Sequence, residues 1–409
     1  MAISKRDFHD KQRGMNYVLL SIAALSIPFV NLGVSFYISF QIFGVVILSI
    51  LILKMGVQRR ALSYCYMASI FFLVKLLVEI RTGSIQELLL VCREMLLYFI
   101  FLLAVAQVSY LPKVSVLINI YKTLIVLFTI ILASQFIAIK NGVFLQFPYE
   151  WYVFNQGTLD GVGLALETES RIRPVGFYGE PSYMAFIVIS ALVLYLAIEN
   201  RFRVAIFTIL LNLMCLLLLG GLSGVLSFII LLAVWGYQNI SLGNGRSRMR
   251  RYFVMSVFTV LSMVSILTQS DFLARLSSIL SKDDMDLSIY GRFIAPVLMI
   301  INMVNEGRFF GYPVSEILRI GEFHGVGSID NAFFFLLLHY GLLAPFLLLI
   351  LFKYVKYRLL IVYAILILNF NGAYFSFDKI ITMSLVIGLS FGVYRGRYSF
   401  SSGGNAVKL

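Results

Sequence analysis

Two arginines, two glycines and an acid gather in one short segment of the chain. The segment Arg171–Ser182 reads Arg-Ile-Arg-Pro-Val-Gly-Phe-Tyr-Gly-Glu-Pro-Ser and leads directly into a long apolar stretch. The guanidinium groups of Arg171 and Arg173 can grip phosphate through two hydrogen bonds each, and Gly176 lets backbone come close to a ligand. Pro181 suits the first turn of a helix, where free N–H groups attract anions. The segment therefore predicts a binding site for a phosphorylated or otherwise anionic group at the mouth of a membrane helix.

Each of these residues also has a structural interpretation. Arg173 could lie at the membrane interface or pair with Glu167 or Glu169, and Arg171, on the same face of an extended segment, could simply bind a carboxylate. Glu180 is a candidate general base. An acid directly before a helix also stabilises the N-terminus, which would keep it ionised and make it a weak base. The residue types alone leave both readings open.

A second group of candidate residues lies further along the chain. His324, in Gly-Glu-Phe-His-Gly-Val-Gly, is a candidate acid–base or phosphate partner, and Arg292 is a candidate phosphate ligand. Asp330 and Asn331 precede another apolar stretch, where they could act on a substrate or cap the helix that follows. His, Cys and carboxylate ligands are not clustered at metal spacing, and the run Asp283–Asp286 is a weak metal candidate. The prediction is a site that uses no metal and no cofactor.

The composition places these residues on a membrane protein. The chain has 409 residues, 60% of them hydrophobic, and a mean hydropathy of +0.92, which excludes a soluble domain. Apolar runs of about 17–25 residues without strand alternation favour an all-α, polytopic integral membrane protein. The twelve predicted spans lie at 15–33, 35–53, 62–80, 86–107, 114–139, 181–199, 203–219, 221–240, 252–268, 330–352, 357–371 and 376–394.

The distribution of positive charge orients these spans. Most of the 33 basic residues fall in alternate short loops and at the two ends of the chain, as expected for segments that remain in the cytoplasm. The net charge of +13 is therefore a topology signal, and no nucleic-acid partner is predicted. Both termini are expected to be cytoplasmic, in a single membrane domain over residues 1–409. Two large loops, at approximately 140–180 and 269–329, are expected to face the outside and to be functional because of their length.

Several polar groups fall within apolar stretches. Ile289–Val304 is short and contains an arginine and a proline, so a re-entrant or surface-lying helix is expected there. Lys75 and Glu79 are four residues apart in the third predicted span, and Arg93-Glu94 lies in the fourth. Intramembrane charges are costly, so they indicate either function or mutual pairing.

The motifs together resemble the bacterial O-antigen polymerase and O-antigen ligase superfamily. The resemblance rests on Arg173-Pro-Val-Gly-Phe-Tyr-Gly-Glu-Pro-Ser182, on Gly291-Arg292, on Phe309-Phe-Gly311, and on Asp330-Asn331 followed by His339-Tyr-Gly341-Leu. It implies a GT-C-like fold in the bacterial inner membrane with an active site facing the periplasm. The ligases typically carry His-Asn where this chain has Asp330-Asn331, and this difference favours a polymerase.

The activity implied by the resemblance belongs to lipopolysaccharide or surface polysaccharide biosynthesis. A glycosyltransferase of this kind moves a glycan from undecaprenyl diphosphate to the sugar hydroxyl of another lipid-linked repeat unit. Its partners would be the lipid-linked oligosaccharide and polymer, the lipid bilayer and a chain-length regulator. Arginines that neutralise the diphosphate leaving group could replace a metal ion, and Glu180, His324 and Asp330 compete to be the base. The alternatives are a ligase that transfers the glycan to lipid A core, and a flippase or transporter. A transporter sequence would be expected to contain two related halves.

Overall fold

The structure is a computed structural model, and the part of the chain that it describes is interrupted. The described residues are 33–35, 38–55, 57–81, 84–109, 115–143, 145, 174–176, 181–198, 202–241, 290–324, 329, 331–370 and 374–401. The first and ninth predicted spans, at 15–33 and 252–268, lie essentially outside these ranges.

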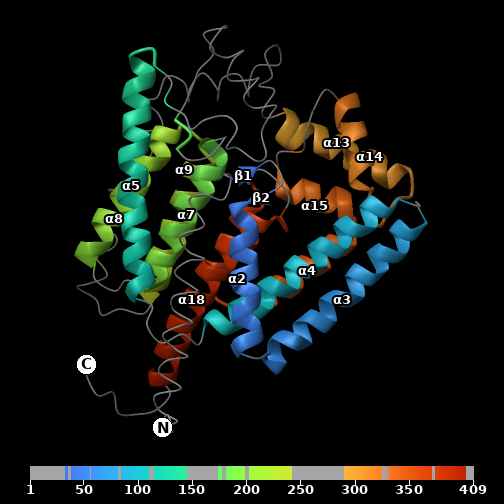
Figure 1. Ribbon diagram of the computed structural model, residues 1–409, viewed down its shortest axis with the longest axis horizontal. Coiled ribbons are helices and arrows are strands. Elements are labelled where there is room, and N and C mark those ends of the chain that lie inside the picture. The colour runs from blue at the N-terminus through green and yellow to red at the C-terminus, as the bar shows by residue number, and fades with distance from the viewer. Residues whose placement is uncertain are drawn as a thin grey trace. The chain divides into compact units, whose positions relative to one another are not determined.

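Helices dominate the described residues (Figure 1). One short antiparallel pair of strands, β1 (Gly33–Ser35) and β2 (Ile38–Ser39), precedes them. The longer helices are α2 (Phe40–Met55), α3 (Arg59–Ile80), α4 (Ile85–Val108), α5 (Ser115–Lys140), α7 (Pro181–Ile198), α8 (Phe202–Leu219), α9 (Leu222–Ser241) and α18 (Phe377–Ser401). The shorter elements are the π-helical turn η3 (Tyr290–Ile294), α13 (Ala295–Asn305), α14 (Val314–Phe323), α15 (Ala332–Tyr340), α16 (Leu343–Val355) and α17 (Arg358–Ile367).

The predicted helical character is confirmed, with two corrections to the predicted spans. Among the described residues, three helical segments are long and apolar enough to cross a membrane: α3, α4 and the Lys122–Lys140 part of α5. The segment predicted as a span at 35–53 begins with the strand pair, and its helix starts only at Phe40. The segment predicted as one span at 330–352 is divided into α15 and α16 by a break at Gly341. The total of twelve spans stays a prediction.

The chain forms two compact units. Unit 1 combines Met1–Cys65, Leu96–Gly220 and Phe375–Leu409. Its centre is α7, which packs against α5, α8 and α18 and is buried around its whole circumference from Met184 to Ala197. Because such a helix needs no polar face, its sequence is apolar all round.

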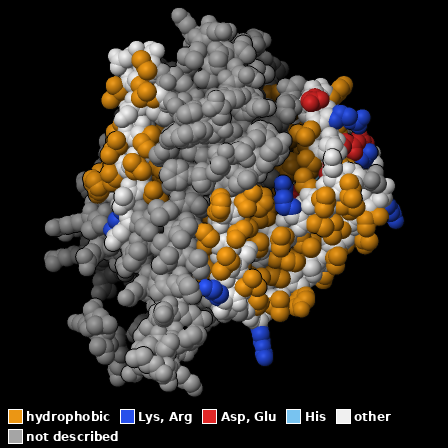
Figure 2. Space-filling model, in the orientation of Figure 1, with side chains coloured by type: hydrophobic (Ala, Val, Ile, Leu, Met, Phe, Trp, Pro, Cys, Tyr) orange, Lys and Arg blue, Asp and Glu red, His pale blue; other side chains and the backbone are white. Residues whose placement is uncertain are grey.

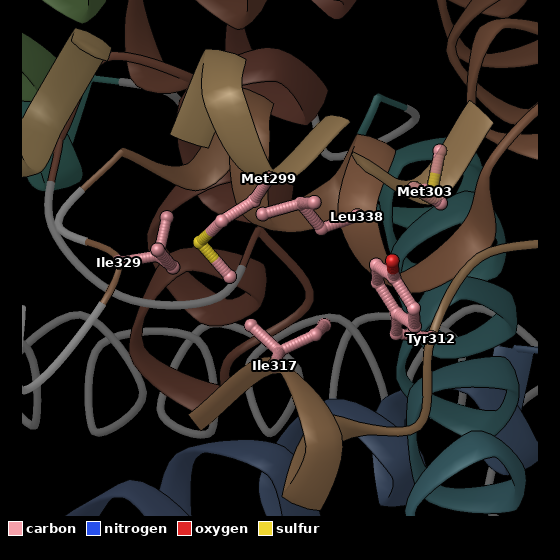
Figure 3. Packing of buried hydrophobic residues seen from close by; sticks show 6 residues of the cluster. All are labelled: Met299, Met303, Tyr312, Ile317, Ile329 and Leu338. Carbon is pink, nitrogen blue, oxygen red and sulfur yellow. The ribbon is translucent and has the colours of Figure 1, made fainter. Parts of the chain in front are cut away.

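Unit 2 combines Tyr66–Met95 and Gly221–Tyr374. Here α13, α14 and α15 pack around a small hydrophobic core (Figure 3). The buried core residues are Met299, Met303, Tyr312, Ile317, Ile329 and Leu338. The core therefore joins the helices of the second predicted outer loop to the start of the next apolar segment.

The surface of unit 2 carries both apolar and charged side chains. Hydrophobic residues of α3 such as Tyr66, Ile70 and Leu77 are exposed, as expected for side chains that contact lipid. Acidic and basic side chains gather around α13 and α14 (Figure 2). The same two helices also expose apolar side chains, among them Ile301 and Phe323. The position of the second loop outside the hydrocarbon therefore stays a prediction.

Candidate functional site

Arg292 lies in the turn η3, directly before α13. Pro296 stands in the first turn of α13 and has no N–H to donate to the carbonyl of Arg292, so a regular helical hydrogen bond is lost and the backbone widens there. The Nε atom of Arg292 is buried and has no hydrogen-bond partner among the described residues. A buried guanidinium nitrogen without a partner is unusual in a folded protein, and it marks a place where an acceptor is expected.

The other two described arginines of the second loop are engaged. Arg308 pairs with Glu316 and with Glu306, whose carboxylate lies 3.3 Å from Arg308 Nε, and its guanidinium lies over the ring of Tyr312. Arg319 lies 3.4 Å from Glu316. Within the described part of this loop, Arg292 therefore differs from Arg308 and Arg319 in having a buried donor without a partner.

Tyr312 is the buried end of this surface network. Its hydroxyl donates to Glu306 at 3.0 Å. Burial, followed by the hydrogen bond to Glu306, raises the pKa of Tyr312 to about 12, so the hydroxyl remains protonated and acts as the donor.

His324 is the C-cap of α14, and its backbone N–H closes the last turn on the carbonyl of Ile320. The ring contacts Phe323 edge-on at 5.6 Å. Its Nε2 atom is buried without a hydrogen-bond partner among the described residues. The side chain thus has one nitrogen that could take or give a proton to a ligand.

Asn331 caps α15. Its side-chain oxygen accepts hydrogen bonds from the backbone N–H groups of Phe333 at 3.0 Å and Phe334 at 3.4 Å. The side chain is buried, so of the two readings left open for Asn331 the structure shows the capping one. The rings of Phe334 and Phe293 meet edge-on at 6.2 Å, which brings this helix start against the turn that carries Arg292.

A buried set of charged side chains from α3 and α4 lies beneath the second loop. Lys75 is fully buried, with Nζ 2.6 Å from Glu79, which confirms that these intramembrane charges pair with one another. The same Nζ donates to the carbonyl oxygens of Phe310 at 3.3 Å and Tyr312 at 3.4 Å. Lys75 thus combines one ion pair with two hydrogen bonds to backbone carbonyls.

Glu87 and Glu94 of α4 also contact segments more than 200 residues away. The carboxylate of Glu87 accepts from the N–H groups of Val314 at 2.9 Å and Ser315 at 2.8 Å, and so stabilises the N-terminus of α14. The carboxylate of Glu94 accepts from the hydroxyl of Tyr340 and lies 3.8 Å from His339 Nε2. These acids connect α4 to the start of α14 and to the end of α15.

Two glycines allow the segment Phe309–Tyr312 to pack against the break between α15 and α16, which together form the interrupted helix. Gly311 has φ +85°, and a Cβ placed on it would lie 2.2 Å from the carbonyl oxygen of His339. Gly341 has φ +55°, and its Cβ would lie 2.2 Å from the carbonyl oxygen of Phe309. The motifs Phe309-Phe-Gly311 and His339-Tyr-Gly341 therefore pack backbone against backbone.

In unit 1 a buried amide holds the loop that contains Gly176. The side-chain oxygen of Gln135 accepts from the N–H groups of Val175 at 3.1 Å and Gly176 at 2.8 Å. Its amide nitrogen donates to the carbonyls of Gly176 at 3.1 Å and Leu145 at 3.0 Å. Gly176 has φ +65°, which favours glycine, and its backbone N–H is occupied by Gln135.

The remaining predicted site residues are Arg171, Arg173, Glu180 and Asp330, all outside the described residues, as is the run Asp283–Asp286. Helix α7 does begin at Pro181, as predicted. Of the described candidates, Gly176 belongs to unit 1, whereas Arg292, His324 and Asn331 belong to unit 2. Within the described part of the chain, no group of three or more His, Cys, Asp or Glu side chains could hold a metal ion.

Sequence reasoning missed the anchoring roles of Gln135 and Glu87. Gln135 had a detectable signal, because an amide within an apolar stretch must find partners when it is buried. Glu87 looked like an ordinary acid in the first turn of a helix, and its partner lies 227 residues away.

One family model matches most of the chain. The model of a family described as WcaD colanic acid polymerase matches residues 15–387. No curated protein and no solved structure matches the chain.

Proposed function

Because the chain belongs to the WcaD colanic acid polymerase family, we propose that it lengthens a surface polysaccharide by glycosyl transfer between lipid-linked repeat units. Family membership and the apolar helices support a membrane-bound polysaccharide polymerase. They favour this activity over attachment of a finished glycan to lipid A core and over transport. The donor in the proposal is a glycan on undecaprenyl diphosphate, and the transfer takes place on the periplasmic side.

The proposed reaction breaks one bond and forms one. The acceptor sugar hydroxyl attacks the anomeric carbon of the donor glycan, and the bond from that carbon to the diphosphate oxygen breaks. Undecaprenyl diphosphate leaves with the electron pair, and the hydroxyl proton passes to a base of the protein. The two requirements are therefore cations at the diphosphate and a proton acceptor at the hydroxyl.

The single observation that carries this proposal is the donor left available on Arg292. Its buried Nε atom has no partner among the described residues, whereas Arg308 and Arg319 are paired with Glu316. A diphosphate oxygen is a suitable acceptor, because a guanidinium binds phosphate in a planar, two-point geometry. Arg171 and Arg173, in the other predicted outer loop, remain candidate phosphate ligands of the same chemical type.

The proposal ranks three residues as the base. Glu180 comes first, on the resemblance and its position directly before α7. His324 comes second, because its buried Nε2 lacks a partner among the described residues. Asp330 comes third, since it precedes the helix cap that Asn331 forms.

The test of the clamp uses purified protein in lipid nanodiscs with lipid-linked repeat units and no added metal. The wild type should produce a ladder of lengthened, lipid-linked products. Arg292→Ala should reduce the rate about a hundredfold, as the loss of one preorganised donor typically does, and Arg292→Lys should rescue it poorly. Arg319→Ala is the matched control, because its side chain is 77% exposed and paired only at the surface. Equal losses of rate in Arg292→Ala and Arg319→Ala would mean that Arg292 contributes only its positive charge.

The same assay tests the type of reaction and the metal. A ligase would add one glycan to a lipid A core acceptor and produce no ladder from repeat units alone. Activity in EDTA is expected to persist, and activity that returns only with Mg²⁺ or Mn²⁺ would contradict a site built on arginine.

The base is tested by removing proton acceptance while keeping size. Glu180→Gln should abolish turnover if Glu180 is the base, while the variant keeps its hydrogen bonds and inserts normally. Retained turnover in Glu180→Gln together with loss in His324→Ala would move the role to His324. Retained turnover in both variants would leave Asp330 as the candidate base.

A further inference from the structure

The break between α15 and α16 leaves backbone groups without helical hydrogen-bond partners. Between Tyr340 and Leu343 the chain leaves the helical conformation, and buried backbone groups there need partners from neighbouring segments. The loop before α14 supplies part of what is needed. Tyr312 N–H donates to the carbonyl of Leu338 at 2.7 Å, and Leu342 N–H donates to the carbonyl of Phe309 at 2.9 Å.

The loop also has carbonyl groups that accept no hydrogen bond from the backbone N–H groups of α15 or α16. The carbonyls of Phe310 and Tyr312 both accept from Lys75 Nζ, and the ring of His339 lies 3.1 Å from the carbonyl of Tyr312 through Nδ1. Removing Lys75 would take this donor from both carbonyls, and the bond to Tyr312 is the buried one, where an unmade hydrogen bond is costly. We therefore propose that Lys75 is a positioning residue: its ammonium holds the segment Phe309–Tyr312 against the break in the α15–α16 helix.

The ion pair with Glu79 does not by itself account for a lysine at this place. A buried pair pays a large desolvation cost, and apolar side chains of similar size often give equal or greater stability. What apolar side chains cannot supply is a donor for two carbonyls. The hydrogen bonds to Phe310 and Tyr312 are therefore the contribution specific to Lys75.

This position matters for the proposed reaction, and to that extent the inference rests on the proposed function. The segment Phe309–Tyr312 links α13, which follows the turn of Arg292, to α14, whose C-cap is His324. Holding the link fixes where both helices lie on their shared core. Lys75 itself is fully buried and touches no substrate, so it acts through the residues it positions.

Two variants distinguish a donor for the loop from a simple ion pair. Glu79→Met keeps the Lys75 nitrogen, which retains two N–H donors even as a neutral amine. Lys75→Met/Glu79→Met removes the nitrogen and leaves two apolar side chains. If Lys75 serves only the ion pair, the double variant should be at least as well ordered as Glu79→Met. If Lys75 holds the loop, the double variant should be worse.

The first measurement is independent of activity. Hydrogen exchange of the peptide spanning 309–315 is followed in nanodiscs without substrate, with peptides of α7 as the internal reference for global folding. In the double variant this peptide should exchange about tenfold faster than in Glu79→Met, because the loop opens locally. Equal exchange in the two variants, or faster exchange in Glu79→Met, would overturn the proposal.

The second measurement is polymerisation by the same preparations. The double variant should lose kcat at least tenfold relative to Glu79→Met, and Lys75→Arg, which retains donors, should recover most of the exchange protection. If the wild type makes no polymer but the exchange rates separate as expected, the proposed function fails and the role of Lys75 stands. If polymer forms at equal rates in both variants, the role of Lys75 in the reaction fails.

Discussion

Both units hold an irregular loop against apolar helices, but they use different side chains. In unit 1 the neutral amide of Gln135 holds Val175 and Gly176. In unit 2 the charged side chains of Lys75 and Glu87 hold the segments 310–312 and 314–315. The difference follows from what each loop backbone presents.

Gly176 offers both an N–H and a carbonyl to the same side chain, and an amide carries both an acceptor and a donor. The loop in unit 2 offers only carbonyls to Lys75, and the start of α14 offers only N–H groups to Glu87. A pure donor and a pure acceptor match these two surfaces, and in proteins such groups are usually charged. The chemistry of an anchor can thus be read from the backbone groups that it must satisfy.

The largest effect is expected at the glycine where the loop of unit 2 packs against the break between α15 and α16. In Gly311→Ala the new methyl group meets backbone at 2.2 Å, and backbone cannot move aside as a side chain can. We expect a loss of about 4 kcal/mol or more in the free energy of unfolding, with little inserted protein. The measurement is thermal unfolding in detergent together with the level of protein in the membrane.

Gly307→Ala is the control for this prediction. Gly307 has a similar φ of +71°, but nothing lies within 4 Å of the added Cβ. Only the backbone conformation is penalised, at about 1 kcal/mol. Similar unfolding temperatures for Gly307→Ala and Gly311→Ala would show that the packing of the loop on the interrupted helix is looser than described.

An intermediate effect is expected from the anchor in unit 1. Gln135→Leu removes the partner of four backbone groups, and we expect it to lower the free energy of unfolding by about 3 kcal/mol because some of these groups stay buried. Gln135→Glu keeps the acceptor for Val175 and Gly176 but places a carboxylate against two carbonyls. It should therefore be no better than Gln135→Leu, and a near-neutral Gln135→Glu would break the link between the anchor's type and the backbone groups it meets.

Apart from the control Gly307→Ala, the smallest effect is expected from Gly176→Ala. Its φ of +65° disfavours alanine, but the nearest atom to an added Cβ is the sulfur of Met184 at 3.1 Å, and a methionine side chain can shift. We expect a loss of about 2 kcal/mol, measured by the same unfolding assay. A loss as large as that of Gly311→Ala would mean that Gly176 meets a rigid surface too.

Local signals in the sequence predicted local features correctly. Pro181 marked the start of α7, and the four-residue spacing of Lys75 and Glu79 left open the pairing that the structure shows. These features depend on residues within one turn of each other, which periodicity and residue type reveal.

The long-range features escaped prediction. Hydropathy read residues 330–352 as one span because α15 and α16 are both apolar, and it carries no information on the backbone that fills the break. Gly341 lies within that predicted span, and its partner Phe309 is defined only by the folded chain. For the same reason the sequence placed Arg292 and His324 in one loop without showing that their neighbours share a core.

The break at Gly341 has a consequence for biogenesis. The groups that close it belong to Phe309 and Tyr312, and Lys75, which holds them, is earlier still in the chain. Since the ribosome makes the chain from its N-terminus, all these groups exist before α15 and α16 emerge. The pair α15 and α16 can therefore pack, as it emerges, against a segment that already offers its hydrogen-bond partners.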